Sequence, residues 1–463
     1  MTETAPESIR TVPPIRENLA FRRLMGASSV SMLGSHITNI AYPLLVLHIT
    51  GSPFIAGCAV FAATAPSILA YMPAGALVDR WSPRQAMLTS ELGRAVAIGM
   101  IAITLALSRP TVTLLMAVAI IEGVLEVFST LAEKRYVGSL VERTQISSAL
   151  VRTEARNHVA LVAGRPLGGL LFGMGPIFPF LADFFSFIYS VTMLFRIEDG
   201  NPAERAAVPP SPISRNSLMG DIKQGLRWMR EDKIARIAVL SFSIGTLIFQ
   251  ALVMIILGDA HNRELPAFAI GIVLAASGVG GALGSLIASH LLPKVSHWMP
   301  IQTAIWFAGF FLFVVGRQFI FIAIVMAILG LTGALGNIAL DTYVMENAGR
   351  DMLARVTSIG RLMTFTACSI GPIIGGILAQ EFGNWRAMSY LCCLTLVPLS
   401  LSISTRLASS RLRDHEVGHW KVVARLRLMP VIIAMSSIIV INIPVVTKIN
   451  GTVGSAISKR TDR

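Results

Sequence analysis

Charged and titratable side chains stand inside long apolar runs of this 463-residue sequence, where lipid would surround them. A charge is costly in hydrocarbon, so such residues usually face a partner or a water-filled space and mark ion or substrate pathways. The chemistry that they offer is the uptake, transfer and release of protons. The candidates, including one amide near the histidine, are His36, Asn39, Glu122, Glu126, Arg165 and Asp183.

Glu122 is the first candidate for a proton-coupling residue. Counting about 1.5 Å of rise per helical residue, it lies near mid-membrane, one turn deeper than Glu126, where desolvation favours a carboxyl that can exchange protons. Glu126 and Arg165 come out at a similar depth, roughly 10 Å from the cytoplasmic helix ends, and could pair. The alternatives are that Glu122 only hydrogen-bonds a neighbouring helix, or that the three residues form a structural cluster.

Three other sites carry polar groups inside apolar runs. His36 and Asn39 lie in the middle of the first expected helix, where His36 could exchange protons near neutral pH, although a simple hydrogen-bonded histidine is the favoured alternative. Asp183 lies nearer the outer face, where a structural role is favoured. Glu91 and Arg94 are three residues apart on one helix, so they could satisfy each other.

The composition shows what must position these residues. Hydrophobic residues make up 54% of the chain and charged residues 14%, and the mean hydropathy is +0.67. Soluble chains average roughly 45–50% apolar and 25% charged residues, so lipid is the expected solvent. The four cysteines lie inside apolar stretches and show neither a disulfide framework nor metal-ligand spacing. The formal charge of +13 does not indicate a nucleic-acid partner, because the basic residues stand in short connections rather than on one face of a soluble domain.

Twelve runs are long enough to be membrane helices, given a hydrocarbon core of about 30 Å. They are residues 22–49, 53–77, 86–108, 111–132, 158–175, 177–196, 236–258, 267–291, 299–316, 319–341, 356–380 and 385–404.

The charges of the connections predict the orientation. If the N-terminus is cytoplasmic, most loop Lys and Arg residues fall inside, and the outside connections carry only Arg109, Arg263, Arg317 and Arg386. This asymmetry predicts a multi-pass protein of the inner membrane with its N-terminus in the cytoplasm. Residues 1–17 are polar, so no cleaved signal peptide is expected.

The two halves of the chain repeat each other, which indicates duplication. A shift of 207 positions matches residues at the end of the fourth helix and in the middle of the fifth. The matched pairs are Tyr136 with Tyr343, Val137 with Val344, Gly164 with Gly371, Gly168 with Gly375 and Gly169 with Gly376.

Polar segments divide the chain further. Residues 217–233 have apolar positions at helical spacing, which predicts a helix lying on the membrane surface or, equally, one packed against the bundle. The apolar segment 429–446 is about the minimum spanning length but contains two prolines and an asparagine, so an extra span and a re-entrant or surface segment both stay open. The predicted divisions are a cytoplasmic tail (1–21), a first six-helix bundle (22–198), a cytoplasmic linker (199–235), a second six-helix bundle (236–405) and a C-terminal tail (406–463).

Two motifs have a recognisable form. The connection GALVDRWSPR contains Gly75, Asp79, Arg80 and Arg84, and its charges can tie neighbouring helix ends together by pairing and capping. It resembles the GxxxDRxGRR signature of the major facilitator superfamily, although Ser82 and Pro83 replace two of its residues. The second motif resembles the GPxxGG exporter motif of that superfamily, as GRPLGG in the first half and GPIIGG in the second. Its residues are Gly164, Pro166, Gly168, Gly169, Gly371, Pro372, Gly375 and Gly376.

Further phrases, such as FLADFFSFIYSV and DIKQGLRWMRED, resemble the branch of this superfamily that holds enterobactin exporters and macrolide-efflux pumps. The resemblance implies an all-α, twelve-helix fold of two pseudo-symmetric six-helix bundles. It also implies efflux of a drug, antibiotic or siderophore by proton antiport and alternating access, with the site between the bundles.

No GxxxxGK[ST] loop is present, so a proton gradient rather than a nucleotide or other cofactor is the expected energy source. No nucleophile and base arrangement suggests an enzyme. The expected partners are a small-molecule substrate, protons and the bilayer, and the chain is expected to be a monomer. The alternative functions are import of a small metabolite and a non-transporting membrane scaffold or sensor.

Overall fold

A computed structural model of the protein describes residues 15, 17–78, 80–197, 215–288, 290, 293–315, 319–348 and 350–403. The chain divides into two compact units, Met1–Arg406 and Leu407–Arg463, and the second lies outside the described residues. Asp79, most of the tail 1–21, much of the linker 199–235 and the apolar segment 429–446 also lie outside them.

The described part of the chain is helical and contains no strand. Side-chain caps begin several helices: Asn18 Oδ1 accepts from the Phe21 N–H at 2.9 Å, and Asp232 Oδ1 accepts from the Ala235 N–H at 2.9 Å. The helices are α1 (Leu19–Thr50), α2 (Pro53–Val78), α3 (Pro83–Ala106), α4 (Val112–Leu140), η1 (Arg143–Gln145), α5 (Ile146–Met174), α6 (Phe178–Phe195), α8 (Arg215–Glu231), α9 (Lys233–Asn262), α10 (Ala267–Ala288), α11 (Val295–Val315), α12 (Phe319–Asn347) and α13 (Arg350–Leu394).

Twelve of the described segments can span a membrane. Ten helices are long and apolar enough by composition, and the last of these, Arg355–Ile403, is broken at Gly383. The φ angle of Gly383 is +76°, in the left-handed region that glycine enters most readily, so this helix comprises two spans. The ten helices therefore give eleven spans. The twelfth span is α5, which has 29 residues but carries Arg156 and Arg165 and is not among the ten. The predicted twelve-helix fold is confirmed.

Several helices are longer than the predicted spans. The predicted fifth span begins at residue 158, whereas α5 begins at Ile146, and the predicted fourth span ends at residue 132, whereas α4 ends at Leu140. Hydropathy detects only the apolar part of a helix, and these helices continue with polar residues beyond that part.

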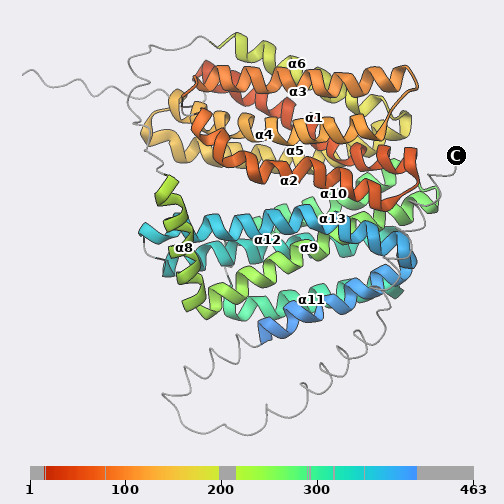
Figure 1. The fold of residues 1–463 in the computed structure, drawn as a ribbon. Helices are drawn as coiled ribbons and strands as arrows, with labels where there is room; N and C mark the ends of the chain where they lie inside the picture. Colours follow the sequence, from red (N-terminus) through yellow and green to blue (C-terminus); the bar gives the residue numbers. More distant parts are fainter. Residues whose placement is uncertain are drawn as a thin grey trace, which may run out of the picture. The chain divides into compact units, whose positions relative to one another are not determined.

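Helices α1–α6 form one bundle and α9–α13 the other (Figure 1), and the bundles meet along two seams, α5 against α10 and α2 against α13. A Cβ atom at Gly169 would lie 2.4 Å from the Ala267 carbonyl oxygen, and one at Gly376 would lie 2.4 Å from the Pro53 carbonyl oxygen. The shift of 207 positions pairs the two glycines, and a shift of 214 pairs Pro53 with Ala267. The two seams are therefore one contact in duplicate.

A second duplicated contact lies one turn along each seam. A Cβ at Gly57 would lie 2.4 Å from the Pro372 carbonyl oxygen, and one at Gly271 would lie 2.7 Å from the Arg165 carbonyl oxygen. Only glycine permits such close approach of two backbones. These contacts lie toward the end of the bundles at which α1 is joined to α2, which we call the α1–α2 end. At that end the halves are closely packed.

The remaining motif glycines pack within their own halves. A Cβ at Gly164 would lie 2.5 Å from His36 Cβ, and one at Gly168 would lie 2.5 Å from the Ile37 carbonyl oxygen, both on α1. Gly371 and Gly375 make the equivalent contacts with α9. Each motif thus fixes the fifth helix of its half against the first and, through its last glycine, against the other half.

Glycine also sets the packing of α2 against α4, and of α10 against α12. A Cβ at Gly123 would lie 1.9 Å from the Ala63 carbonyl oxygen, and one at Gly330 would lie 2.0 Å from the Ser277 carbonyl oxygen. A Cβ at either position must push a helix backbone aside.

We expect Gly123→Ala to lower the free energy of unfolding by about 1–3 kcal/mol, the usual cost of overpacking a rigid contact. The matched control is Gly138→Ala on the same helix, where a Cβ meets nothing within 4 Å. Thermal unfolding of the detergent-solubilised chain measures both variants. Equal unfolding temperatures for the two would contradict the packing argument.

The connection after α2 ties helix ends together, as its charged motif predicts. Arg84 donates from Nε to the Leu194 carbonyl at 3.0 Å and from Nη2 to the Phe195 carbonyl at 2.8 Å, at the C-terminus of α6. Arg80 of the same motif is exposed, and Gly75 lies on α2 with no atom within 4 Å of a Cβ placed there.

Helix α8, which contains residues 217–231 of the predicted amphipathic segment, packs against the second bundle. A Cβ at Gly225 would lie 2.7 Å from Ile359 Cδ1 on α13, and the buried Met229 joins a cluster with Val239 and Val356. Of the two placements expected for residues 217–233, the structure shows the helix packed against the bundle.

Candidate functional site

The first bundle contains a buried charged network centred on Arg94 of α3. Arg94 donates from Nε to Glu122 Oε2 on α4 at 2.8 Å and from Nη2 to Ser35 Oγ on α1 at 2.9 Å. Its Nη1 lies 3.7 Å from Glu91 Oε1, one turn earlier on α3. The guanidinium also lies over the ring of Phe187 on α6, 4.5 Å from the ring centroid. One cation thus joins four helices.

The network continues to Asp183 on α6. Thr38 on α1 donates to Asp183 Oδ2 at 2.6 Å, and Ser186 donates to Asp183 Oδ1 at 3.2 Å. A Cβ at Gly34 would lie 2.4 Å from Asp183 Oδ1, so the carboxylate reaches α1 because that position is glycine. Thr38 and Ser35 are three residues apart on α1, so one face of this helix serves both Asp183 and Arg94.

The network holds more acids than bases. Glu91, Arg94 and Asp183 are 2%, 5% and 1% exposed, and the side chain of Glu122 is 14% exposed. If all three carboxyls were ionised, one cation would face three anions in a region of low dielectric. Glu91 Oε2 and Glu122 Oε1 are buried with no hydrogen-bond partner among the described residues. An excess of buried carboxyls with free oxygens is a site that can take up protons.

The sequence-based expectation for Glu126 and Arg165 is wrong in one respect, because the two do not pair. Arg165 turns toward the other half, where its Nη1 donates to the Leu274 carbonyl at 3.0 Å and to Ser277 Oγ at 3.1 Å on α10. Glu126 is exposed. The alternative cluster of Glu122, Glu126 and Arg165 is wrong for the same reason, since the cation beside Glu122 is Arg94.

Arg94 is not among the candidates predicted from sequence, which predicts only a local pair between Arg94 and Glu91. The local contact exists, but the shorter one is with Glu122, 28 positions away. The sequence does contain a signal for Arg94, because burying an arginine in the apolar run 86–108 costs as much free energy as burying the candidate residues named above. Asp183, expected to be structural, lies within electrostatic range of Arg94 and bonds Thr38 on the same face of α1 as Ser35.

A second polar group lies where the bundles meet. Arg165 is within electrostatic range of His36 on α1 and of Cys368 on α13. Gln250 on α9 donates from Nε2 to Cys368 Sγ at 3.2 Å. These residues come from both halves, and Arg165, His36, Gln250 and Cys368 are each partly exposed. Asn39, one turn after His36, is exposed.

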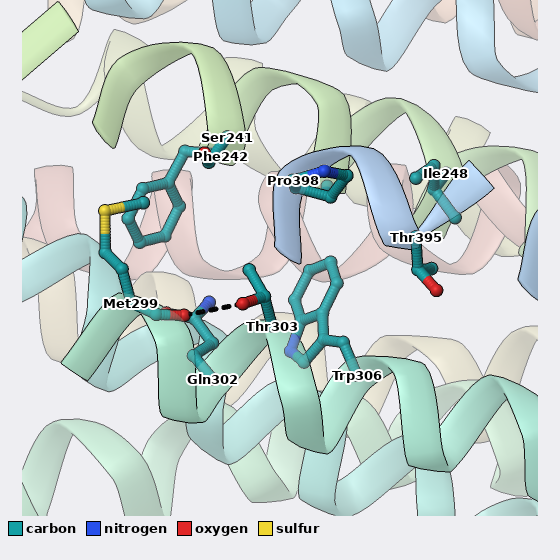
Figure 2. A pocket seen from close by; sticks show the side chains of 10 residues that line it. Ser241, Phe242, Ile248, Met299, Gln302, Thr303, Trp306, Thr395 and Pro398 are labelled. Carbon is teal, nitrogen blue, oxygen red and sulfur yellow. Dashed lines mark hydrogen bonds between the residues drawn. The ribbon is translucent and has the colours of Figure 1, made fainter. Parts of the chain in front are cut away.

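A pocket in the second bundle lies apart from both polar groups. Figure 2 shows it between Phe242 of α9, Trp306 of α11 and Pro398 near the end of the segment Arg355–Ile403, with about 380 Å³ of empty space including its mouth. No ionisable side chain lines it. The Trp306 indole N–H already donates to Thr332 Oγ1 at 3.0 Å. The pocket offers an apolar surface and no proton chemistry.

Comparisons with known proteins agree with this architecture. A family described as transmembrane secretion effector matches residues 9–436. The multidrug efflux pump Tap of Mycolicibacterium fortuitum is 23% identical over 379 residues, covering 78% of this chain and 89% of that protein. The enterobactin exporter EntS of Shigella boydii serotype 4 (strain Sb227) is 23% identical over 375 residues, covering 79% of this chain and 87% of that protein. The crystal structure of the nucleoside transporter NupG superimposes with a TM-score of 0.67 at 14% identity, covering 84% of this chain and 99% of that one.

Proposed function

The chain belongs to the transmembrane secretion effector family of the major facilitator superfamily, and from that premise we propose that it exports an amphiphilic small molecule in exchange for protons. The protein is a multi-pass membrane protein, and its family and relatives are transporters rather than enzymes. The names of the relatives, a multidrug efflux pump and an enterobactin exporter, support efflux of a drug-like or siderophore-like molecule.

The observation that carries proton coupling is the network around Arg94. Glu91 and Glu122 pair with the one cation Arg94, Asp183 lies within electrostatic range of it, and two of the carboxyl oxygens are unpartnered among the described residues. Protonating one of the carboxyls reduces the net negative charge of the site, so the number of bound protons can change with the state of the transporter. Glu122 is the proposed coupling residue because it pairs with Arg94 and keeps an unpartnered oxygen. Asp183 is the second residue that we propose for proton coupling.

The seams support alternating access. We place the N-terminus in the cytoplasm, as the loop charges predict, so the α1–α2 end faces outward. The glycine contacts close that end. Ser52 Oγ, just before α2, also donates to Gln380 Oε1 on α13 at 2.5 Å and so joins the two halves there. The arrangement corresponds to a state closed to the outside, and export requires both seams to separate.

Everted membrane vesicles containing the full chain test the proposal. We expect an inwardly directed substrate flux when the vesicle interior is acidified, and loss of that flux when an uncoupler collapses the gradient. A panel of cationic, neutral and anionic amphiphiles is the appropriate set of probes. Vesicles that show no uncoupler-sensitive flux for any member would contradict proton-coupled export.

The same vesicles separate the rival functions. An importer of a small metabolite would release substrate from these vesicles rather than accumulate it. A scaffold or sensor would move no member of the panel in either direction.

A further inference from the structure

Arg165 has more hydrogen-bonding capacity than its surroundings use. Its guanidinium carries five N–H donors, and the described residues accept only from Nη1, through the Leu274 carbonyl and Ser277 Oγ. Arg165 forms no ion pair with any carboxylate in the part of the chain that the structure describes. Both acceptors are neutral, so the described residues leave the positive charge uncompensated inside the membrane span. Such a charge is expensive unless it serves a ligand or a partner.

Helix packing does not require a cation at this position. The shift of 207 positions places Arg165 on Pro372, and the two residues occupy equivalent places in the two seams. Each presents its carbonyl oxygen to a glycine of the other half, Gly271 in one seam and Gly57 in the other. The second seam achieves this contact with a proline, so the guanidinium is an addition to a packing scheme that works without it.

The neighbours of Arg165 suit a polar ligand. His36 and Cys368 lie within electrostatic range of the guanidinium, and Gln250 bonds the Cys368 thiol at 3.2 Å. These three groups come from α1, α9 and α13 and offer hydrogen bonds but no negative charge. The helices belong to both halves, so a ligand bound here contacts both bundles, and these contacts change when the bundles move relative to each other.

We propose that Arg165 binds an anionic oxygen group, such as a carboxylate or sulfonate, of the amphiphile that the protein transports. A planar guanidinium presents paired donors that match two oxygens of such a group. The inference rests on the proposed function for one point only, that the bound anion is part of an exported molecule. It narrows the substrate class to amphiphiles with an acidic head.

Binding to the full chain in nanodiscs of zwitterionic lipid tests the proposal. The probes are 8-anilinonaphthalene-1-sulfonate and N-phenyl-1-naphthylamine, which share a ring system but differ in the sulfonate. Energy transfer from the protein's tryptophans reports binding, with empty nanodiscs as the blank. We expect Arg165→Gln to weaken sulfonate binding about tenfold, the scale of one charge-assisted bidentate contact, and to leave binding of the neutral amine unchanged. Arg165→Lys should lose less sulfonate affinity, because lysine keeps the positive charge but lacks the paired donors of the guanidinium.

Two controls separate an anion site from a structural latch between α5 and α10. Ser277→Ala removes one acceptor of Arg165 but keeps the cation, so sulfonate binding should persist, whereas a latch would be weakened by Ser277→Ala and Arg165→Gln alike. Arg109→Gln removes the same charge from an exposed connection and should change nothing. The proposal is overturned if the wild-type chain binds the sulfonate no better than the amine, or if Arg165→Gln keeps the preference. Failure of proton-driven flux in vesicles would instead contradict the proposed function and leave this binding result standing.

Discussion

Replacing Arg94 with glutamine is expected to destabilise the first bundle more than any other single charge removal. Glu122 and Glu91 would lose the cation that faces them at 2.8 and 3.7 Å, and Ser35 would lose its donor. Breaking a buried ion pair by removing one partner typically costs about 3–5 kcal/mol, because a charge is left buried and uncompensated. Thermal unfolding of the detergent-solubilised chain should show a large downward shift.

A double variant identifies the source of that loss. Arg94→Gln combined with Glu122→Gln leaves two neutral groups that can still hydrogen-bond, so much of the stability should return. Transport should not return, because the carboxyl proposed to couple it to protons is gone. Arg109→Gln is the matched control for removing an arginine at an exposed position. If the single and double variants unfold at the same temperature, the Arg94–Glu122 pair is not what stabilises the bundle.

The second large effect is expected at Glu122 itself. Glu122→Gln preserves the size of the side chain and an acceptor for Arg94 Nε but cannot exchange a proton. We expect uncoupler-sensitive flux in everted vesicles to fall at least about tenfold, since Glu122 is the residue proposed to bind and release the coupled proton. Substrate binding to the purified chain should persist.

The control for that experiment is Glu142→Gln, which removes an exposed carboxyl just beyond the C-terminus of α4. Its flux should match that of the wild-type chain. Unchanged uncoupler sensitivity in Glu122→Gln would exclude Glu122 as the coupling residue and direct attention to Asp183. A scaffold function would survive both substitutions.

The twelve spans could be predicted from sequence because apolar length is a one-dimensional property of the chain. The break at Gly383 falls between the predicted spans 356–380 and 385–404, where the apolar pattern also stops. The helix ends could not be predicted as well, because α5 and α4 continue through polar residues that hydropathy does not count. Their extension depends on tertiary packing.

The candidate site was only partly accessible to the same reasoning. Apolar context selects residues that are costly to bury, and it selected Glu122, Arg165 and Asp183. Depth along a helix places Glu126 level with Arg165 but does not say which way either side chain points. The structure turns Arg165 toward α10 and joins Glu122 to Arg94, and both outcomes depend on helix rotation and on neighbours far apart in the sequence.

The polar character of α5 has a consequence for how the protein enters its membrane. With Arg152, Arg156 and Arg165 in one helix, α5 would partition poorly into lipid as an isolated segment. Arg156 pairs with Glu133 of α4 at 2.5 Å, with both side chains largely buried. Glu133 of α4 therefore neutralises the charge of Arg156, so we expect the two helices to leave the insertion machinery as a hairpin rather than one after the other. Biogenesis of the first bundle would then depend on Glu133, a residue outside the transport pathway proposed above.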